Sequence, residues 1–268
     1  PKLPRDLTDR NRTSPFAFTG NKFEFRMVPS SESVAGPNVV LNTIAAEIFS
    51  EFAEALEKST DKKATVTKLI IDTYNAHKRV VFNGNGYTQD WVEEAAKRGL
   101  PNINNTVDAI METTKDYSMD VFTKYGIFKK EELESREHIY LEKYSKQINI
   151  EAKVMVEMSN LQIFPAATGY AKKLADTISA VKAAGVTAPL AQADVLAAVV
   201  ENLNGLKAKT DELSALVAEA AGKDCVHAQA KFYRDAVCTK MAEARVFGDA
   251  LEKLVEKEAW PFPTYEHL

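Results

Sequence analysis

Residues 196–220 read LAAVVENLNGLKAKTDELSALVAEA, and positions suited to burial recur along this stretch at intervals of three and four. These positions are Leu196, Val199, Leu203, Leu206, Thr210, Leu213, Val217 and Ala220. The seven-residue repeat places one side chain per turn on the same face of a helix. The stretch therefore predicts a long helix that packs along its length against neighbouring helices, and we derive no cofactor site from it.

Long helical patterns lie on both sides of this helix. Residues 131–184 carry an apolar stripe and contain Pro165, whose missing N–H should kink or divide the helix. Gly185 and Gly222 mark the ends of the first and second long segments, and a last helix is expected over about residues 224–258. Because short connections join these three segments, we expect them to be antiparallel neighbours.

The chain before residue 131 predicts shorter helices. One helix begins near Pro37 and carries an apolar face as far as Leu56. A second is expected over residues 63–81, with Val66, Leu69, Ile70, Tyr74 and His77 on one side. Both faces have the spacing of faces that are buried in folded proteins. Residues 83–128 are interrupted by turn signals and predict only short helices.

The two ends of the chain differ from this helical pattern. Residues 1–38 contain five prolines and one strand pattern. Residues 260–265, WPFPTY, hold two prolines that exclude a helix, and such an aromatic tail is expected to dock on the protein itself or on a partner. We therefore expect a mainly α fold, a long antiparallel helix bundle that follows a short β-strand or hairpin segment.

Composition argues against several classes of function. The formal net charge of −4, from 34 basic and 38 acidic residues, gives no support for a nucleic-acid partner. No apolar stretch is long enough to predict a membrane span, and residues 1–15 lack the apolar run of a secretory signal. Cys225 and Cys238 are expected to be free thiols in a reducing cytosol, so we expect a cytoplasmic protein. The four histidines show no metal-binding spacing, and no phosphate-binding loop is present.

The stretch Lys22-Phe23-Glu24-Phe25-Arg26 alternates charged and aromatic residues like a strand. One interpretation is an edge strand whose charged face is solvated and prevents pairing with other chains. In another interpretation these cations, together with Arg12, bind phosphate or carboxylate groups, and Glu24 holds a divalent metal ion beside the phosphates. A metal ion and several cations beside phosphate groups are typical of phosphoryl-transfer sites. A single carboxylate, however, does not supply enough ligands for a metal ion. The residues alone leave both interpretations open.

A family resemblance bears on this choice. Residues 11–28, NRTSPFAFTGNKFEFRMV, and residues 37–47, PNVVLNTIAAE, resemble the end of the catalytic domain of glutamine synthetase. The family's N-R element, R-x-E-x-R strand and N-P-Y-L-type helix start correspond to Asn11-Arg12, to the strand from Lys22 to Arg26, and to the helix start at Pro37. Later stretches resemble the C-terminal helical extension of the type III form, namely residues 142–144, 149–152, 164–166 and 260–265. The resemblance covers essentially the whole chain.

The resemblance implies ATP-dependent condensation of glutamate with ammonia through γ-glutamyl phosphate. Glu24 would be a ligand of the Mg or Mn ion that bridges the nucleotide phosphates, and Arg26 would hold glutamate or the transferring phosphoryl group. Arg12 and Lys22 would contact the ATP phosphates. Lys22 stands where the commoner forms carry Arg, and Ala17 stands where they carry a further phosphate-binding Arg.

The resemblance also implies a division of the chain and a setting for it. Residues 1–45 would form the end of the catalytic domain, and residues 46–268 would form a helical C-terminal domain. The family's other metal ligands, its ammonia-binding aspartate and its glutamate loop would precede this sequence, so we expect this chain to lack activity alone. We expect a homo-oligomer with active sites between subunits. The alternative is a non-catalytic helical-bundle module for interaction or assembly.

Overall fold

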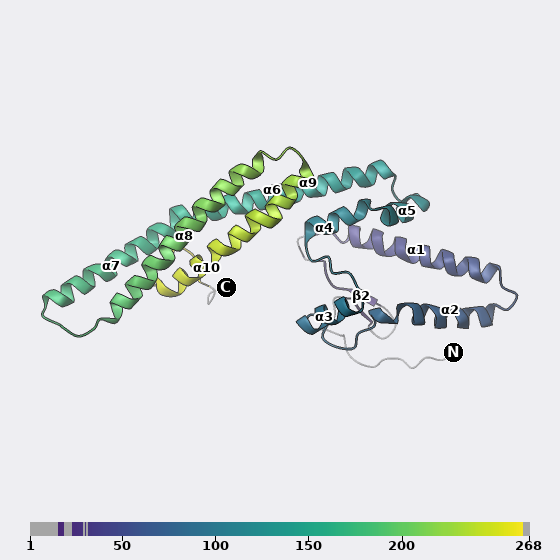
Figure 1. Ribbon diagram of the computed structural model, residues 1–268, viewed down its shortest axis with the longest axis horizontal. Helices are drawn as coiled ribbons and strands as arrows, with labels where there is room; N and C mark the ends of the chain where they lie inside the picture. Colours follow the sequence, from purple (N-terminus) through teal and green to yellow (C-terminus); the bar gives the residue numbers. More distant parts are fainter. Residues whose placement is uncertain (1–15, 19–22, 29, 31, 265–268) are drawn as a thin grey trace. The chain divides into compact units, whose positions relative to one another are not determined.

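The computed structural model describes residues 16–18, 23–28, 30 and 32–264. The chain divides into two compact units, Pro1–Leu133 and Glu134–Leu268. Helices dominate the described part of the chain (Figure 1), which confirms the expectation of a mainly α fold. None of its described helices combines the length and the hydropathy that a bilayer crossing requires.

The first unit begins with the expected hairpin. Strands β1 (Phe16–Phe18) and β2 (Phe23–Phe25) pair antiparallel, and Ala17 lies opposite Glu24 in the register. Because side chains alternate between the two faces of a strand, Glu24 lies on one face of β2, and Phe23 and Phe25 lie on the other, where they meet Phe16.

Five helices follow in the first unit. They are α1 (Ala35–Glu57), α2 (Lys62–His77), α3 (Gln89–Lys97), α4 (Thr106–Met111) and α5 (Asp116–Lys124), with single 3-10 turns at Lys78–Val80 and Glu112–Thr114. The α1 and α2 helices run in opposite directions from the short connection that joins them (Figure 1). Asp61 caps α2 by accepting from the Ala64 N–H at 3.0 Å, and Asn105 caps α4 by accepting from the Asp108 N–H at 2.9 Å.

The apolar faces of α1 and α2 are not buried as expected. Among their described residues, only Thr43 of α1 is buried, and none of α2 is. Phe49 is 70% exposed and Ile70 is 62% exposed, and His77 is exposed as well. The amphipathic spacing specifies a helix correctly, but burial also requires a neighbouring surface that covers the face. Within the first unit, the described elements cover these faces only in part.

Four long helices and one short helix make up the described part of the second unit. They are α6 (Lys130–Met158), α7 (Phe164–Ala183), α8 (Ala191–Ala221), α9 (Val226–Phe232) and α10 (Cys238–Leu254). The α6 helix begins just before the boundary between the units. The α8 helix runs back alongside α7 and packs against α10 (Figure 1). The positive φ of Gly185 and the position of Gly222 as C-cap of α8 confirm the two predicted helix ends.

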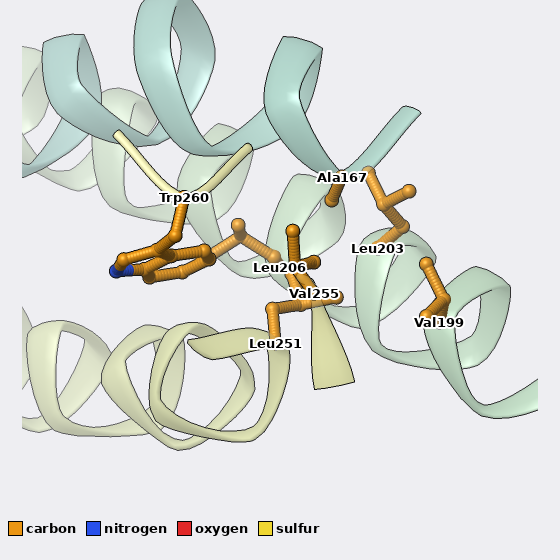
Figure 2. Close-up of a cluster of buried hydrophobic side chains, with 7 residues drawn as sticks. All are labelled: Ala167, Val199, Leu203, Leu206, Leu251, Val255 and Trp260. Carbon is orange, nitrogen blue, oxygen red and sulfur yellow. The ribbon is translucent and has the colours of Figure 1, made fainter. Parts of the chain in front are cut away.

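The seam predicted on α8 forms the core of this unit. Seven of its eight positions are buried, all except Leu196. Val199, Leu203 and Leu206 pack with Ala167, Leu251, Val255 and Trp260 in one cluster (Figure 2). Leu213, Val217 and Ala220 pack with Ala152, Tyr233 and Val237 in a second. Each fully buried leucine contributes about 1.5–3 kcal/mol relative to an exposed one, so this face is the main source of the unit's stability.

Two π-helical turns interrupt the long helices. The first, Ser159–Ile163, joins α6 to α7 just before Pro165, which lies in the first turn of α7. Because proline has no N–H to donate to the carbonyl four residues earlier, the regular helix is interrupted there, as predicted. The second turn, Tyr233–Val237, joins α9 to α10 and contains neither proline nor glycine. The expected last helix, over about residues 224–258, is present as one unbroken helical run from Val226 to Leu254, but the sequence did not predict the π turn inside it.

A close approach joins α8 to α10. A Cβ atom added to Gly205 would lie 2.3 Å from Cε1 and 2.5 Å from Cδ1 of Phe247. The missing side chain therefore lets the Phe247 ring pack directly on the α8 backbone. This contact explains a glycine in the middle of a 31-residue helix, where glycine costs about 1 kcal/mol relative to alanine.

Candidate functional site

The hairpin brings together Glu24 of β2 and Arg26, the first residue after β2. Arg26 Nε donates to Glu24 Oε2 at 3.1 Å, and Arg26 Nη2 lies 3.0 Å from the same oxygen. The two side chains are 25% and 20% exposed, so the ion pair is half-buried. The pair is local because residues i and i+2 of a strand point to the same side.

The opposite face of the hairpin is aromatic and exposed. The Phe16 ring stacks on Phe23 with centroids 5.4 Å apart, and it meets Phe25 edge-on at 6.2 Å. Phe23 is nevertheless 64% exposed. An edge strand with a solvated charged face would show the reverse arrangement, with its aromatic residues covered and its charges in water. The alternation therefore predicted the two faces correctly, whereas the edge-strand interpretation assigned them the wrong environments.

One donor group of Arg26 has no hydrogen-bond partner. Its Nη2 atom is buried and makes no hydrogen bond of good geometry, although it lies within ion-pair distance of Glu24. A guanidinium carries five N–H donors in a planar fork that matches carboxylate and phosphate groups. An incoming carboxylate or phosphoryl oxygen would satisfy this buried donor, whose desolvation is otherwise only partly compensated.

The other two candidate residues, Arg12 and Lys22, lie outside the described residues. Within the described ranges, no group of three or more His, Cys, Asp or Glu side chains could hold a metal ion. Glu24 offers one carboxylate, which alone is too little for a divalent ion that takes six or more oxygen ligands. The described residues therefore do not form a complete metal site, and no metal-dependent step can be derived from them.

Comparisons with known proteins connect this hairpin to a family. A family model described as "Glutamine synthetase C-terminal domain" matches residues 65–182. A type-3 glutamine synthetase of Dictyostelium discoideum is 39% identical, over 100% of this chain and 38% of that protein. A glutamine synthetase of Butyrivibrio fibrisolvens is 38% identical over 98% of this chain, and one of Bacteroides fragilis (strain YCH46) is 30% identical over 100% of it.

The chain belongs to the glutamine synthetase family. It corresponds to the C-terminal part of the type III form, as its motifs indicated. It spans 38% of the length of the curated relatives that it matches. The alignment with the Dictyostelium enzyme covers the whole chain, so the hairpin lies inside the glutamine synthetase resemblance.

The glutamine synthetase family model and the compact units divide the chain differently. The matched residues 65–182 begin in α2 and end in α7, and thus extend through both units. The predicted boundary at residue 45 falls inside α1, which continues through it without a break. The assignment of residues 1–45 to a catalytic domain stays a prediction.

A second candidate site, a pocket beside the aromatic tail, was not predicted from the sequence. The aromatic tail was expected to dock, and Trp260, which is 8% exposed and packs in the α8 core cluster, confirms this. The tail also borders a pocket between α6 and α10. A pocket depends on how several helices pack together, and the only signal in the sequence was the aromatic–proline run itself.

Proposed function

We propose that this chain is the C-terminal part of an ATP-dependent glutamate–ammonia ligase, which forms glutamine through γ-glutamyl phosphate. The proposal rests on one observation above all: the half-buried Glu24–Arg26 pair lies on a strand that aligns with a type-3 glutamine synthetase. In this proposal glutamate, ammonia and ATP are the substrates, and the helical remainder supports a cytoplasmic homo-oligomer.

Each candidate residue has a role in the proposal. Arg26 uses its fork of donors to hold the glutamate carboxylate or the transferring phosphoryl group. Glu24 orients Arg26 through the hydrogen bond at Nε and provides one oxygen ligand to a Mg or Mn ion, whose remaining ligands lie outside the described residues. Arg12 and Lys22 contact the ATP phosphates. The metal ion would neutralise charge on the phosphates during transfer.

Substitution of Glu24 tests the proposal. We expect Glu24→Ala in the full-length gene product to lower the rate of glutamine formation by at least about two orders of magnitude, the scale of losing one group that stabilises transition-state charge. The thermal midpoint should change little, because a partly solvated ion pair contributes about 0–1 kcal/mol. Glu201→Ala, which removes an exposed carboxylate of α8, is the matched control. Unchanged turnover of Glu24→Ala would leave the pair with a purely structural role.

A non-catalytic assembly module remains the second candidate. The exposed apolar faces of α1 and α2 favour it, because monomeric soluble proteins seldom expose large contiguous apolar surface. The two candidates share the fold and differ in whether the hairpin takes part in chemistry. Activity that depends on Glu24 supports the ligase, whereas a full-length gene product that forms no glutamine supports the module.

A further inference from the structure

A pocket of about 450 Å³ lies in the second unit, between the end of α6, α10 and the aromatic tail. Its walls are mainly apolar and include Met155, Met158, Met241 and Phe262. Methionine side chains are unbranched and adapt to ligands of different shape. The volume falls within the range of small-molecule sites, about 300–1,000 Å³.

One polar group in the wall has no partner. Trp260 is 8% exposed, and its Nε1 atom is buried without a hydrogen-bond partner. The indole ring packs against the α8 core cluster, and Figure 2 shows the ring nitrogen on the side turned away from Leu206 and Leu251. Buried indole N–H groups normally find an acceptor, and an unpaired one is destabilising. An acceptor carried by a ligand in the pocket would remove this penalty once a small shift of the aromatic tail turned the N–H toward it.

The backbone around the pocket is also unusual. Ser159 and Ile163, the first and last residues of the π-helical turn, both line it. Such turns occur frequently at functional sites. Gly248 of α10 lies opposite, and a Cβ atom added there would meet only Ile163 Cδ1, at an ordinary 3.9 Å. A larger side chain at Gly248 would therefore project into space that is now open.

Charged residues in the pocket lining restrict the chemistry of a ligand. Glu151, Asp249 and Glu252 supply three carboxylates, whereas Arg245 supplies one cation, which is paired with Asp249 at 3.3 Å. This excess of negative charge disfavours anionic ligands. We infer that the pocket binds a neutral, largely apolar small molecule with one hydrogen-bond acceptor, such as a carbonyl oxygen, and that the acceptor takes the Trp260 N–H.

Nile red is a suitable probe because it is neutral and apolar and carries a ring carbonyl. The chain contains two tryptophans, Trp91 and Trp260, so a proton–nitrogen NMR spectrum holds two indole N–H signals, which a Trp91→Phe variant assigns. On titration of the full chain, we expect the Trp260 signal to move downfield and the Trp91 signal to stay. A Trp260 signal that does not respond to the probe overturns the inference.

Two matched glycine variants locate the binding. Gly248→Leu fills the pocket and should weaken Nile red binding at least tenfold, as followed by the Trp260 signal. Gly169→Leu places the same side chain in an exposed part of α7 with no neighbour within 4 Å, and should leave the affinity within twofold. Equal affinities of the two variants contradict the inference. Should Gly248→Leu fail to fold, the Trp260 signal of the unsubstituted chain still decides.

A third variant tests the hydrogen bond itself. Trp260→Phe keeps an aromatic ring in the core but removes the donor. We expect its Nile red binding, followed by the NMR methyl signals of Met155 and Met158 in the pocket wall, to weaken about two- to tenfold. Probe fluorescence alone cannot replace these measurements, because the exposed apolar faces of α1 and α2 also offer Nile red a surface. Full affinity in Trp260→Phe would exclude the proposed contact.

Discussion

At the scale of single residues, the alternation of charged and aromatic side chains in residues 22–26 specified a strand with two distinct faces. It could not specify which face meets solvent, because that depends on what packs against the hairpin. The structure half-buries Glu24 and Arg26 and leaves Phe23 exposed. The environment of the candidate site was therefore the part that sequence reasoning predicted least well.

Thr210 presents a simpler test at the same scale. It occupies a seam position of α8, is 1% exposed, and its hydroxyl has no hydrogen-bond partner. Thr210→Val replaces this hydroxyl with a methyl group of similar size. We expect the free energy of unfolding to rise by about 1 kcal/mol, because a buried unsatisfied group is removed. Chemical denaturation measures the change, and a loss of stability would show that the hydroxyl has a partner, such as a buried water.

Gly205 provides a prediction of opposite sign. Alanine is the better helix former, yet its Cβ would collide with the Phe247 ring. We expect Gly205→Ala to lower the free energy of unfolding by about 1–3 kcal/mol, the range for an overpacked core. Gly169→Ala, at an exposed helical position without neighbours within 4 Å, should instead raise it by up to about 1 kcal/mol. Similar effects of both substitutions would refute the close contact between α8 and α10.

At the scale of elements, the sequence predicted those features correctly that depend on residues close together in the chain. The heptad spacing identified the buried face of α8, and the missing N–H of Pro165 identified the break between α6 and α7. The second π turn, Tyr233–Val237, carries no comparable signal. The faces of α1 and α2 were expected to be buried because their spacing is amphipathic, but their burial depends on a covering surface.

An ion network joins α8 to α10, and its contribution to stability can be tested. Lys240 lies 2.5 Å from Glu212 and 2.6 Å from Glu243, and Lys209 pairs with both glutamates. Hydrogen bonds from Lys240, and then from Lys209, lower the pKa of Glu212 and Glu243 below the ordinary value of 4.5. The same contacts, first with Glu212, raise the pKa of Lys240.

The lowered pKa values of Glu212 and Glu243 determine the pH range over which the network stabilises the fold. Their stabilising effect is present above the unfolded value of 4.5 and is lost as the pH falls through the lower, folded pKa values. Lys240→Met keeps the apolar stem and removes the charge. We expect its thermal midpoint to lie below that of the unsubstituted chain at pH 6–7, and the difference to shrink below about pH 4. A difference that is constant over this range would show that the network does not stabilise the fold.

At the scale of the whole molecule, the two units differ in how they bury apolar surface. The second unit has two core clusters along α8. In the first unit, only one residue of α1 and no residue of α2 is buried in the described part of the chain. The relatives are longer than this chain, which spans 38% of them. A homo-oligomeric ligase, as proposed, would offer further surface to cover these faces.

The central claim is that Glu24 binds a metal ion beside ATP. The most direct measurement is a structure of the full-length gene product with a non-hydrolysable ATP analogue and Mn²⁺, located by its anomalous signal. We expect a Glu24 carboxylate oxygen in the coordination sphere, at about 2.0–2.3 Å from the ion, with Arg26 directed at a substrate or phosphate group. A Glu24 carboxylate that stays outside the coordination sphere, with Mn²⁺ bound elsewhere, would contradict this.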